Sequence, residues 1–410
     1  MRTQRFGFLL ILAALAPTAR AVEVDVQSST QYLRYSDYLS NPQDQQDVAE
    51  YLRLSARFDD KGNIRVEGYG RILGQLQTSV EPRNGFSDDV IGRLYYLYLD
   101  YRDLLPNHLD LRLGRTFVGS PANPGIVDGG QVTGRNLLLD GLGATAFGGR
   151  RVFLDNKSEL PWDDDYLWGG SVFLDTVKLT RVEVSYAREI LSNELARENT
   201  AIDVTTTPTS TVSAYGRYKY DMPASRASEV LLGVKVAPVE KLVLKGELYQ
   251  SAPTFDSFSF YRYFGVENYK QGTIAAEYRL GSVVRLSASY AYEKFDADEH
   301  ANVLGAGLWA QPIPSLTLDV FYENRSGYAG KLGGVRAHAA YAFWKATVLA
   351  GADYDDFKRQ DSRDGTSRKY WAGADVRLNK TFGLALRAER NESFYFDPSY
   401  QSWLALDVHL

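Results

Sequence analysis

The chain ends on the stretch that decides its fold, Tyr400-Gln-Ser-Trp-Leu-Ala-Leu-Asp-Val-His-Leu410. Aliphatic side chains occupy every second position of it, at Leu404, Leu406, Val408 and Leu410. A period of two places these side chains on one face of a strand. Because a strand that ends a chain leaves backbone donors and acceptors exposed at its edge, we expect it to pair with the first strand and close a barrel.

The N-terminus has the pattern of a secretory signal peptide. Arg2 and Arg5 precede an apolar run from Phe6 to Ala16, and Ala19-Arg20-Ala21 gives a small-x-small cleavage site. The alternative, a membrane-anchoring helix, is disfavoured because the run is about half of the ~20 residues that a spanning helix needs. We therefore predict a signal peptide over residues 1–21, a single barrel domain over residues 22–410, and export of the mature chain.

Composition limits the classes of function. The chain has 46 Lys and Arg, three of them in the predicted signal peptide, against 51 Asp and Glu. This acidic balance argues against a nucleic-acid partner, which requires a basic surface. Because the chain has no cysteine, disulfides, Cys-ligated metals and covalently attached haem are excluded, and we predict no cofactor. The 35 glycines and 28 tyrosines suit a barrel, in which only every second residue is apolar and aromatic residues form interfacial girdles.

Apolar and polar residues alternate in several segments of the N-terminal part of the chain. A weakly alternating first strand is expected over Val22–Tyr35. Two hairpins follow, the first over Leu52–Phe58 and Ile64–Ile72, the second over Leu94–Tyr101 and Leu109–Val118. In the first hairpin the charged residues all fall on one face, which we expect to be the inner face of the barrel.

The next part is rich in glycine and is expected to be irregular. Residues 119–134 also contain proline, and they are predicted to form a long loop. Asn136–Phe147 is predicted to be a strand, Gly148-Gly149 a tight turn, and Arg150–Asp155 a short, weak strand.

Several short motifs follow one another in this region. Leu111-Arg-Leu-Gly-Arg-Thr-Phe117 is followed by Val127-Asp-Gly-Gly130, by Gly134-Arg135 and by Leu139-Asp-Gly-Leu-Gly-Ala-Thr-Ala-Phe-Gly-Gly149. A basic strand, a loop and an Asp-Gly-Leu strand in this order resemble outer-membrane porins of the substrate-specific and alginate-export type. The last strand also resembles the closing strand of bacterial outer-membrane barrels, although Leu410 stands where those carry an aromatic residue. The resemblance implies a porin of the Gram-negative outer membrane, in contact with lipid and lipopolysaccharide.

In the C-terminal half, short turns alternate with longer polar connections. Short turns are expected at Pro238-Val-Glu-Lys, Gly281-Ser282, Pro312-Ile-Pro-Ser, Lys345 and Asn379-Lys380. Longer connections are expected at Phe295–His300, Arg325–Lys331, Asp355–Ser367 and Asn391–Ser399. Transmembrane barrels have this asymmetry, with short turns on the periplasmic side and long loops outside.

With both termini at the end that carries the short turns, the number of strands must be even. Weak strands at Arg150–Asp155 and at Ala201–Thr206, the second turning at Thr207-Pro208-Thr209, bring the count to about 22, and without them it falls to about 20 or 18. A soluble sandwich would also alternate, but its apolar face would need a second sheet to cover it. We predict an all-β protein, a transmembrane antiparallel up-and-down β-barrel of about 22 strands (range 18–22).

Charged residues occupy the face opposite the apolar one. Val284, Leu286 and Tyr290 are expected to face outward, and Arg285 and Ser287 to face the lumen. The predicted pore-lining residues are Arg53, Arg57, Arg65, Glu67, Arg71, Arg112, Arg217, Lys235, Lys245, Arg285, Arg336, His338, Arg377 and Arg387. Two interpretations stay open. The wall is either a solvated surface of mixed charge that braces the strands, or its N-terminal arginines form a ladder that steers anions.

Two functions compete. No hydrolase, metalloprotease or phosphate-binding motif is present in the sequence, so we predict that the chain is not an enzyme. The first function is a porin through which small hydrophilic solutes, anions included, diffuse. The second is the sheath of a porin–cytochrome conduit, with a periplasmic or outer-membrane multihaem cytochrome as partner.

A barrel of about 22 strands is wide, so a porin must narrow its own lumen with loops such as 119–134 or Phe255–Phe264. Whether these loops fold inward therefore discriminates between the two functions. The identity of the solute is left open, and so is a homo-oligomer.

Overall fold

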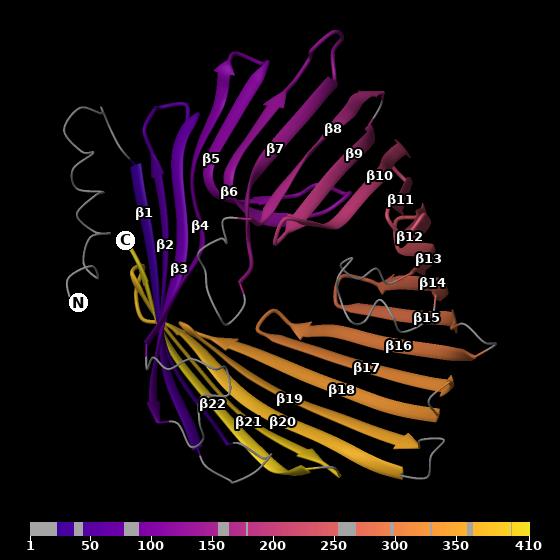
Figure 1. Cartoon of the computed structure of the whole chain (residues 1–410). Coiled ribbons are helices and arrows are strands. Elements are labelled where there is room, and N and C mark those ends of the chain that lie inside the picture. Colours follow the sequence, from indigo (N-terminus) through magenta and orange to yellow (C-terminus); the bar gives the residue numbers. More distant parts are fainter. Residues whose placement is uncertain are drawn as a thin grey trace.

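The computed structural model describes residues 23–36, 44–77, 90–154, 164–177, 179–252, 268–295, 299–328, 330–358, 364–394 and 396–410. The predicted signal peptide and the predicted loop Phe255–Phe264 lie outside these residues. The described residues form one antiparallel sheet of 22 strands (Figure 1). In chain order the strands are β1 Glu23–Ser36, β2 Asp44–Arg57, β3 Ile64–Gln77, β4 Val90–Leu105, β5 Leu109–Val118, β6 Gly125–Gly134, β7 Leu142–Val152, β8 Tyr166–Val177, β9 Thr180–Leu191, β10 Glu194–Thr209, β11 Val212–Asp221, β12 Arg226–Val239, β13 Leu242–Ser251, β14 Tyr269–Leu280, β15 Val284–Lys294, β16 His300–Ile313, β17 Leu316–Gly327, β18 Gly330–Phe343, β19 Ala346–Lys358, β20 Asp364–Arg377, β21 Phe382–Ser393 and β22 Phe396–His409.

The sheet closes on itself. Every strand pairs with the next along the chain, and β1 pairs with β22 from Gln27 opposite His409 to Tyr35 opposite Gln401. Beyond the last strand residue, the Leu410 N–H donates to the Val26 carbonyl at 2.9 Å, and the Val26 N–H donates to the Leu410 carbonyl at 3.1 Å. In Figure 1 the yellow end of the chain lies beside the indigo β1. The predicted closure by the last strand, the all-β class and the count of 22 are confirmed.

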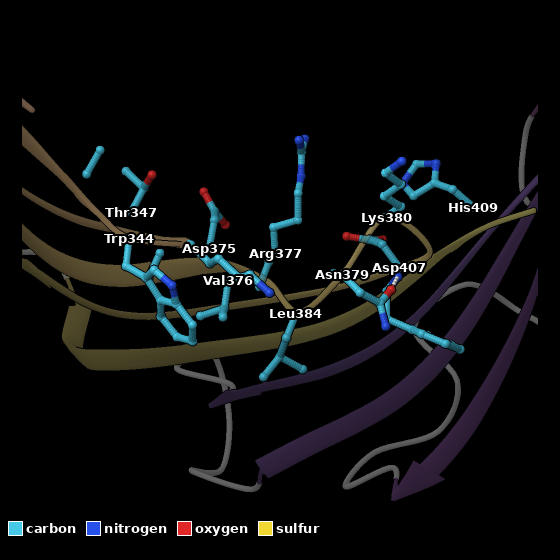
Figure 2. Close-up of a pocket in the computed structure, with 16 residues that line it drawn as sticks. Trp344, Thr347, Asp375, Val376, Arg377, Asn379, Lys380, Leu384, Asp407 and His409 are labelled. Carbon is cyan, nitrogen blue, oxygen red and sulfur yellow. Dashed lines mark hydrogen bonds between the residues drawn. The ribbon is translucent and has the colours of Figure 1, made fainter.

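One face of the sheet is apolar and exposed. On β22, Leu404 and Leu406 are 44% and 39% exposed, whereas Ala405 between them is 1% exposed. Figure 2 shows the same alternation near the chain end, where Asp375 projects from one side of the sheet and Val376 from the other. Since nothing in the described chain covers the apolar face, it is the outer face of the barrel.

Connections differ between the two ends of the barrel. At the end that holds both termini, two residues join β10 to β11, β12 to β13, β16 to β17 and β18 to β19. The longest connections, 78–89, 153–165 and 252–268, join strand ends at the opposite side. The predicted asymmetry is confirmed.

Three of the predicted long connections are mostly strand. β17 and β18 leave only 328–329 between them, β19 and β20 leave 359–363, and β21 and β22 leave 394–395. Here the strands continue past the apolar belt, so water reaches both of their faces. The alternation of apolar and polar residues is therefore lost at these strand ends, although the backbone pairing continues.

The prediction for the glycine-rich region is wrong in its details. Residues 125–134 form strand β6 instead of loop, and Gly148 and Gly149 lie within β7 instead of in a turn, so Arg150–Asp155 is not a separate strand. Glycine is a poor strand former, but close packing requires it here. A Cβ atom on Gly129 would lie 2.1 Å from the Gly148 carbonyl oxygen. The count of 22 survives because one missed strand offsets one false strand.

Two turns lie elsewhere than predicted. The segment between β6 and β7 is a turn, so the predicted strand Asn136–Phe147 starts only at Leu142. Asn136 adopts a φ of 52°, and its side-chain oxygen accepts a hydrogen bond of 2.8 Å from the Gly141 N–H, an arrangement that asparagine favours. The expected strand Ala201–Thr206 is confirmed as part of the longer β10, and the chain turns after Thr209.

Candidate functional site

The candidate site is the inner face of the barrel. The register places every predicted pore-lining residue on the face opposite the exposed apolar one. Arg53, for example, is opposite Tyr69, and Lys235 is opposite Lys245. On β18 and β19, Arg336 is opposite Asp353. That these residues line a conducting pore stays a prediction.

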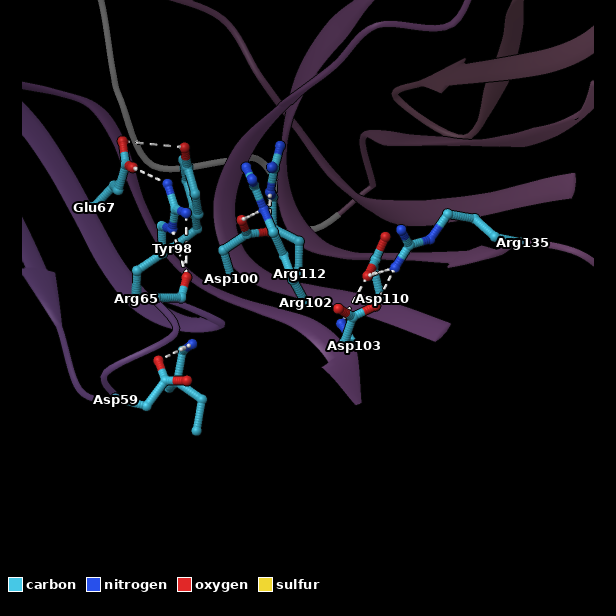
Figure 3. A network of polar contacts seen from close by, with 12 residues as sticks. Asp59, Arg65, Glu67, Tyr98, Asp100, Arg102, Asp103, Asp110, Arg112 and Arg135 are labelled. Carbon is cyan, nitrogen blue, oxygen red and sulfur yellow. Dashed lines mark hydrogen bonds and ion pairs between the residues drawn. The ribbon is translucent and has the colours of Figure 1, made fainter. Parts of the chain in front are cut away.

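The arginines of the N-terminal wall differ in their partners. Arg57 pairs with Glu23 at 3.0 Å, and Arg65 lies 3.8 Å from Glu67. Arg112 donates to Asp100 at 3.1 Å (Figure 3). These pairs neutralise much of the charge of the expected ladder.

Further along the network of Figure 3, Arg135 bridges two carboxylates. Its Nη2 atom lies 2.6 Å from Asp103 and 2.7 Å from Asp110. Arg135 begins the turn between β6 and β7, so the bridge ties this turn to the ends of β4 and β5. Its position indicates that it braces the wall.

Arg53 and Arg71 form no ion pair within the described chain. They lie beside stacked tyrosines: Tyr51 and Tyr69 have ring centroids 6.3 Å apart, and the Arg71 guanidinium lies 6.0 Å from the centre of the Tyr51 ring. Arg53 also lines a recess of about 740 Å³ with both tyrosines. Neither cation is therefore held in a direct ion pair, although the Asp47 carboxylate lies within electrostatic range of Arg71.

The other walls carry mixed charge. Arg217 pairs with Asp203 at 2.8 Å, Lys245 with Glu247 at 2.9 Å, Arg285 with Glu277 at 3.8 Å, and Arg387 with Glu389 at 3.2 Å. His338 lies 3.5 Å from Asp353. Lys235, Arg336 and Arg377 form no ion pair among the residues that the structure describes.

A recess at the end with the termini was not predicted as a unit. It has a volume of about 780 Å³ and is lined by Asp375, Arg377, Lys380, Asp407 and His409. Figure 2 shows these side chains on the inner side of β20 to β22. Of these, Arg377 is among the predicted pore-lining residues, and Asp375 lies two residues before it on β20. Lys380 lies in a turn, and Asp407 and His409 lie on the closing strand, where no charged run indicates a site.

The segment between β5 and β6 folds against the inner wall. Ala122 is fully buried in a cluster with Val127, Leu167, Ala187 and Ala201, all of which point inward. This cluster is the apolar core of the described chain, and it lies inside the barrel. The inward folding expected of a porin loop is therefore observed for residues 119–124, the part of the predicted loop that is not strand.

A buried carboxylate anchors this segment. Glu189 of β9 is 2% exposed and accepts hydrogen bonds from Asn123 at 3.0 Å and from Arg151 at 2.7 Å. Arg197 of β10 lies 4.0 Å from it. Neither Glu189 nor Asn123 was predicted, since neither belongs to a motif and their contact joins residues far apart in the chain.

The described residues hold no cluster of His, Asp and Glu suited to a metal ion. Among the same residues, no helix is long and apolar enough to cross a membrane.

A closed antiparallel sheet with an apolar outer face and a charged inner face is the architecture of a transmembrane β-barrel. The described chain meets both conditions, since β1 pairs with β22 and alternate residues are apolar and exposed.

Comparison with known proteins places the fold more narrowly. No family model and no curated protein matches the sequence. Among solved structures, the chain is similar to OccK9 (OpdG) of Pseudomonas aeruginosa, with 12% identity over 95% of this chain and 98% of that one and a TM-score of 0.50. OpdK of Pseudomonas aeruginosa, solved with vanillate, and a BenF-like porin from Pseudomonas fluorescens Pf-5 each show 10% identity, 96% and 100% coverage, and a TM-score of 0.49. At this identity the likeness shows the fold alone. The resemblance to outer-membrane porins stated from the sequence is confirmed at that level.

Proposed function

We propose that the chain is an outer-membrane porin of a Gram-negative bacterium through which small hydrophilic solutes diffuse. The observation that carries this proposal is the segment 119–124, which packs against the inner wall through Ala122 and Asn123. A wide barrel needs such a segment if it is to act as a selective pore without a partner. The charged inner face supports the same function, because it keeps the lumen hydrated.

The solutes that pass most readily are anions. Arg53 and Arg71 retain unpaired charge beside Tyr51 and Tyr69, whereas Arg57 and Arg65 are paired with acids. Unpaired cations concentrate anions near the wall, and paired ones do so much less. The steering role proposed for the arginine ladder therefore falls on Arg53 and Arg71, and the bracing role falls on Arg57, Arg65 and Arg112.

The mature chain starts at Val22 after removal of residues 1–21, and the barrel contacts lipid and lipopolysaccharide. An intact mass of the protein extracted from outer membranes tests this start. A mass that includes residues 1–21 would contradict it.

Swelling of liposomes that contain the purified protein tests the function. We expect swelling in small neutral sugars, faster swelling in small organic anions, and none with boiled protein. The competing function, a sheath around a multihaem cytochrome, requires a lumen free of its own constriction. Liposomes that swell in no solute would favour the sheath, and equal rates for anions and cations would remove the anion preference but leave the porin.

A further inference from the structure

Lysines lie directly opposite one another on the outer face of the barrel. Lys270 of β14 is opposite Lys294 of β15. Likewise, Lys331 of β18 is opposite Lys358 of β19. All four side chains are exposed, on the same face as the exposed apolar residues of their strands. Like charges that are directly opposite destabilise a sheet, so the pairs are unfavourable unless an anion neutralises them. We call the outer surface from Lys270 to Lys358 the lysine surface.

The described chain supplies few acids to this surface. The outward positions of β14 to β18, all of which the structure describes, carry no Asp or Glu. Asp356 and Asp364 lie beside Lys358 at the border of the surface, but neither forms an ion pair with a described residue.

Three of the four lysines remain without an acid. Lys270, Lys331 and Lys358 form no ion pair within the described part of the chain. Lys294 has another contact within the chain, so the other three lysines carry the charge that is not neutralised.

Neutral polar side chains occupy the surface between the two lysine pairs. Asn302 of β16 points outward opposite Tyr292, and Ser326 of β17 points outward opposite Lys331. Asn324 lies two residues from Ser326 on the same face. The strands β15 and β18, which carry the inner lysine of each pair, are three strands apart, or about 14 Å across the sheet. The surface therefore has two cationic positions with hydrogen-bonding groups between them.

The lysine surface lies at the level of the lipid headgroups. Tyr292 and Tyr322 are 42% and 45% exposed on the outer face. Outward aromatic residues mark the boundary between hydrocarbon and headgroups in a transmembrane barrel. Lys294 lies two residues beyond Tyr292, and Asn324 two residues beyond Tyr322, toward the same end of the barrel. Lysine side chains at this position reach the polar layer of the membrane.

Only one end of these strands carries outward charge. At the end with the termini, the outward positions of β14 to β18 are uncharged, and Leu280, Val284 and Phe343 are examples. The lysine surface lies at the opposite end, where the longest connections are, and this end is the outer side of a transmembrane barrel. An anion that neutralises the lysines therefore belongs to the outer leaflet.

We propose that the lysine surface binds the phosphate groups of lipid A, the membrane anchor of lipopolysaccharide. Lipid A carries phosphates at the two ends of a disaccharide, which matches two cationic positions separated by neutral polar groups. Charge-assisted hydrogen bonds from lysine to phosphate are stronger than neutral ones. A phospholipid with a single phosphate can occupy only one of the two positions. The site shares its outer-membrane location with the proposed function, but it does not require that the barrel conducts.

Binding of purified lipid A to the delipidated, folded protein in detergent micelles tests the proposal. The variant K331Q/K358Q removes an outward lysine pair. The control K235Q/K245Q removes a lysine pair that is directly opposite on the inner face of β12 and β13. EDTA is present throughout, so that divalent ions cannot bridge the phosphates to acids. Native mass spectrometry counts the bound lipid A, and heat-modifiability on gels confirms that each variant is folded.

The outward pair should matter and the inward pair should not. We expect K331Q/K358Q to weaken the binding of bisphosphorylated lipid A roughly tenfold, because each lysine near an anionic membrane surface contributes to the attraction. The control K235Q/K245Q should bind like the wild-type protein. Adding K270Q to K331Q/K358Q should weaken binding further. Equal binding by K331Q/K358Q and K235Q/K245Q would overturn the proposal.

Two other lipids identify the phosphate contact. Lipid A without its phosphates should bind the wild-type protein many-fold more weakly, and so should phosphatidylglycerol. Equal binding of lipid A with and without phosphates would overturn the proposal. Phosphatidylglycerol that binds as tightly as lipid A would also overturn it, because the occupant would then be an ordinary phospholipid. A barrel that binds lipid A but does not conduct would contradict only the porin function.

Discussion

The two halves of the barrel are built differently. From β11 to β22, outward positions are apolar, inward positions are polar or charged, and most turns at the end with the termini are short. From β1 to β10, the inner face also carries the buried apolar cluster around Leu167 and Ala187, the buried carboxylate of Glu189 and the segment 119–124. In the second half each face meets a single environment. In the first half, by contrast, the segment 119–124 covers part of the inner face. Apolar residues therefore occur on both faces of the sheet there.

The largest difference between the halves is expected in the free energy of unfolding that is lost when an inward carboxylate is removed. Glu189→Ala leaves Arg151 without its carboxylate in a buried site, and removing one partner of such a pair costs about 3–5 kcal/mol. Glu323→Ala removes an inward carboxylate of β17 that forms no ion pair within the described chain, so its effect should lie within about 0.5 kcal/mol. Urea unfolding in lipid vesicles measures both free energies. Equal losses would show that Glu189 is not an anchor.

The regular half allows a test of the two faces. Leu286→Arg places a charge on the outer face and should cost about 2–4 kcal/mol, whereas Ser287→Arg places it on the hydrated inner face and should be tolerated. The yield of heat-modifiable barrel after refolding measures the difference. Similar yields for the two variants would mean that the faces are inverted.

A smaller difference between the halves is expected in the loss of stability when a glycine is replaced by alanine. A Cβ atom at Gly129 would meet the Gly148 carbonyl at 2.1 Å, so Gly129→Ala should cost about 1–3 kcal/mol, as overpacking does. A Cβ atom at Gly246 of β13 would meet Val234 at an ordinary 3.7 Å, so Gly246→Ala is the matched control. The same urea titration compares them, and a stable Gly129→Ala variant would show that β6 and β7 can separate at little cost.

The smallest effect concerns ion selectivity within the N-terminal wall. The double variant R53Q/R71Q should lower the anion/cation permeability ratio at low salt, whereas R57Q/R65Q should change it less because those cations are already paired. The difference should fade as salt rises, since the screening length is ~10 Å at 0.1 M. Reversal potentials in salt gradients measure the ratio. If the two double variants changed the permeability ratio equally, all four arginines would have only the structural role of bracing the wall.

Alternation predicted most of the barrel, because its period follows from lipid on one side and water on the other. It identified the faces of β15 and β18, the short turns and the closing strand. The alternation did not predict β6 and β7, because close packing requires glycines there and glycines produce no apolar pattern.

The anchor at Glu189 could not be predicted from spacing. Its contact with Asn123 joins residues 66 positions apart, and its pair with Arg151 joins residues 38 positions apart. The inward direction of the predicted arginines followed from their alternation. Which of them are paired with acids depended on neighbouring strands, which no local pattern specifies.

Single-channel conductance of the wild-type protein in planar bilayers tests the central claim most directly. We predict discrete, uniform conductance steps from the purified chain alone, with anion selectivity at low salt. A protein that inserts as a folded barrel but conducts no ions without removal of a partner would contradict it.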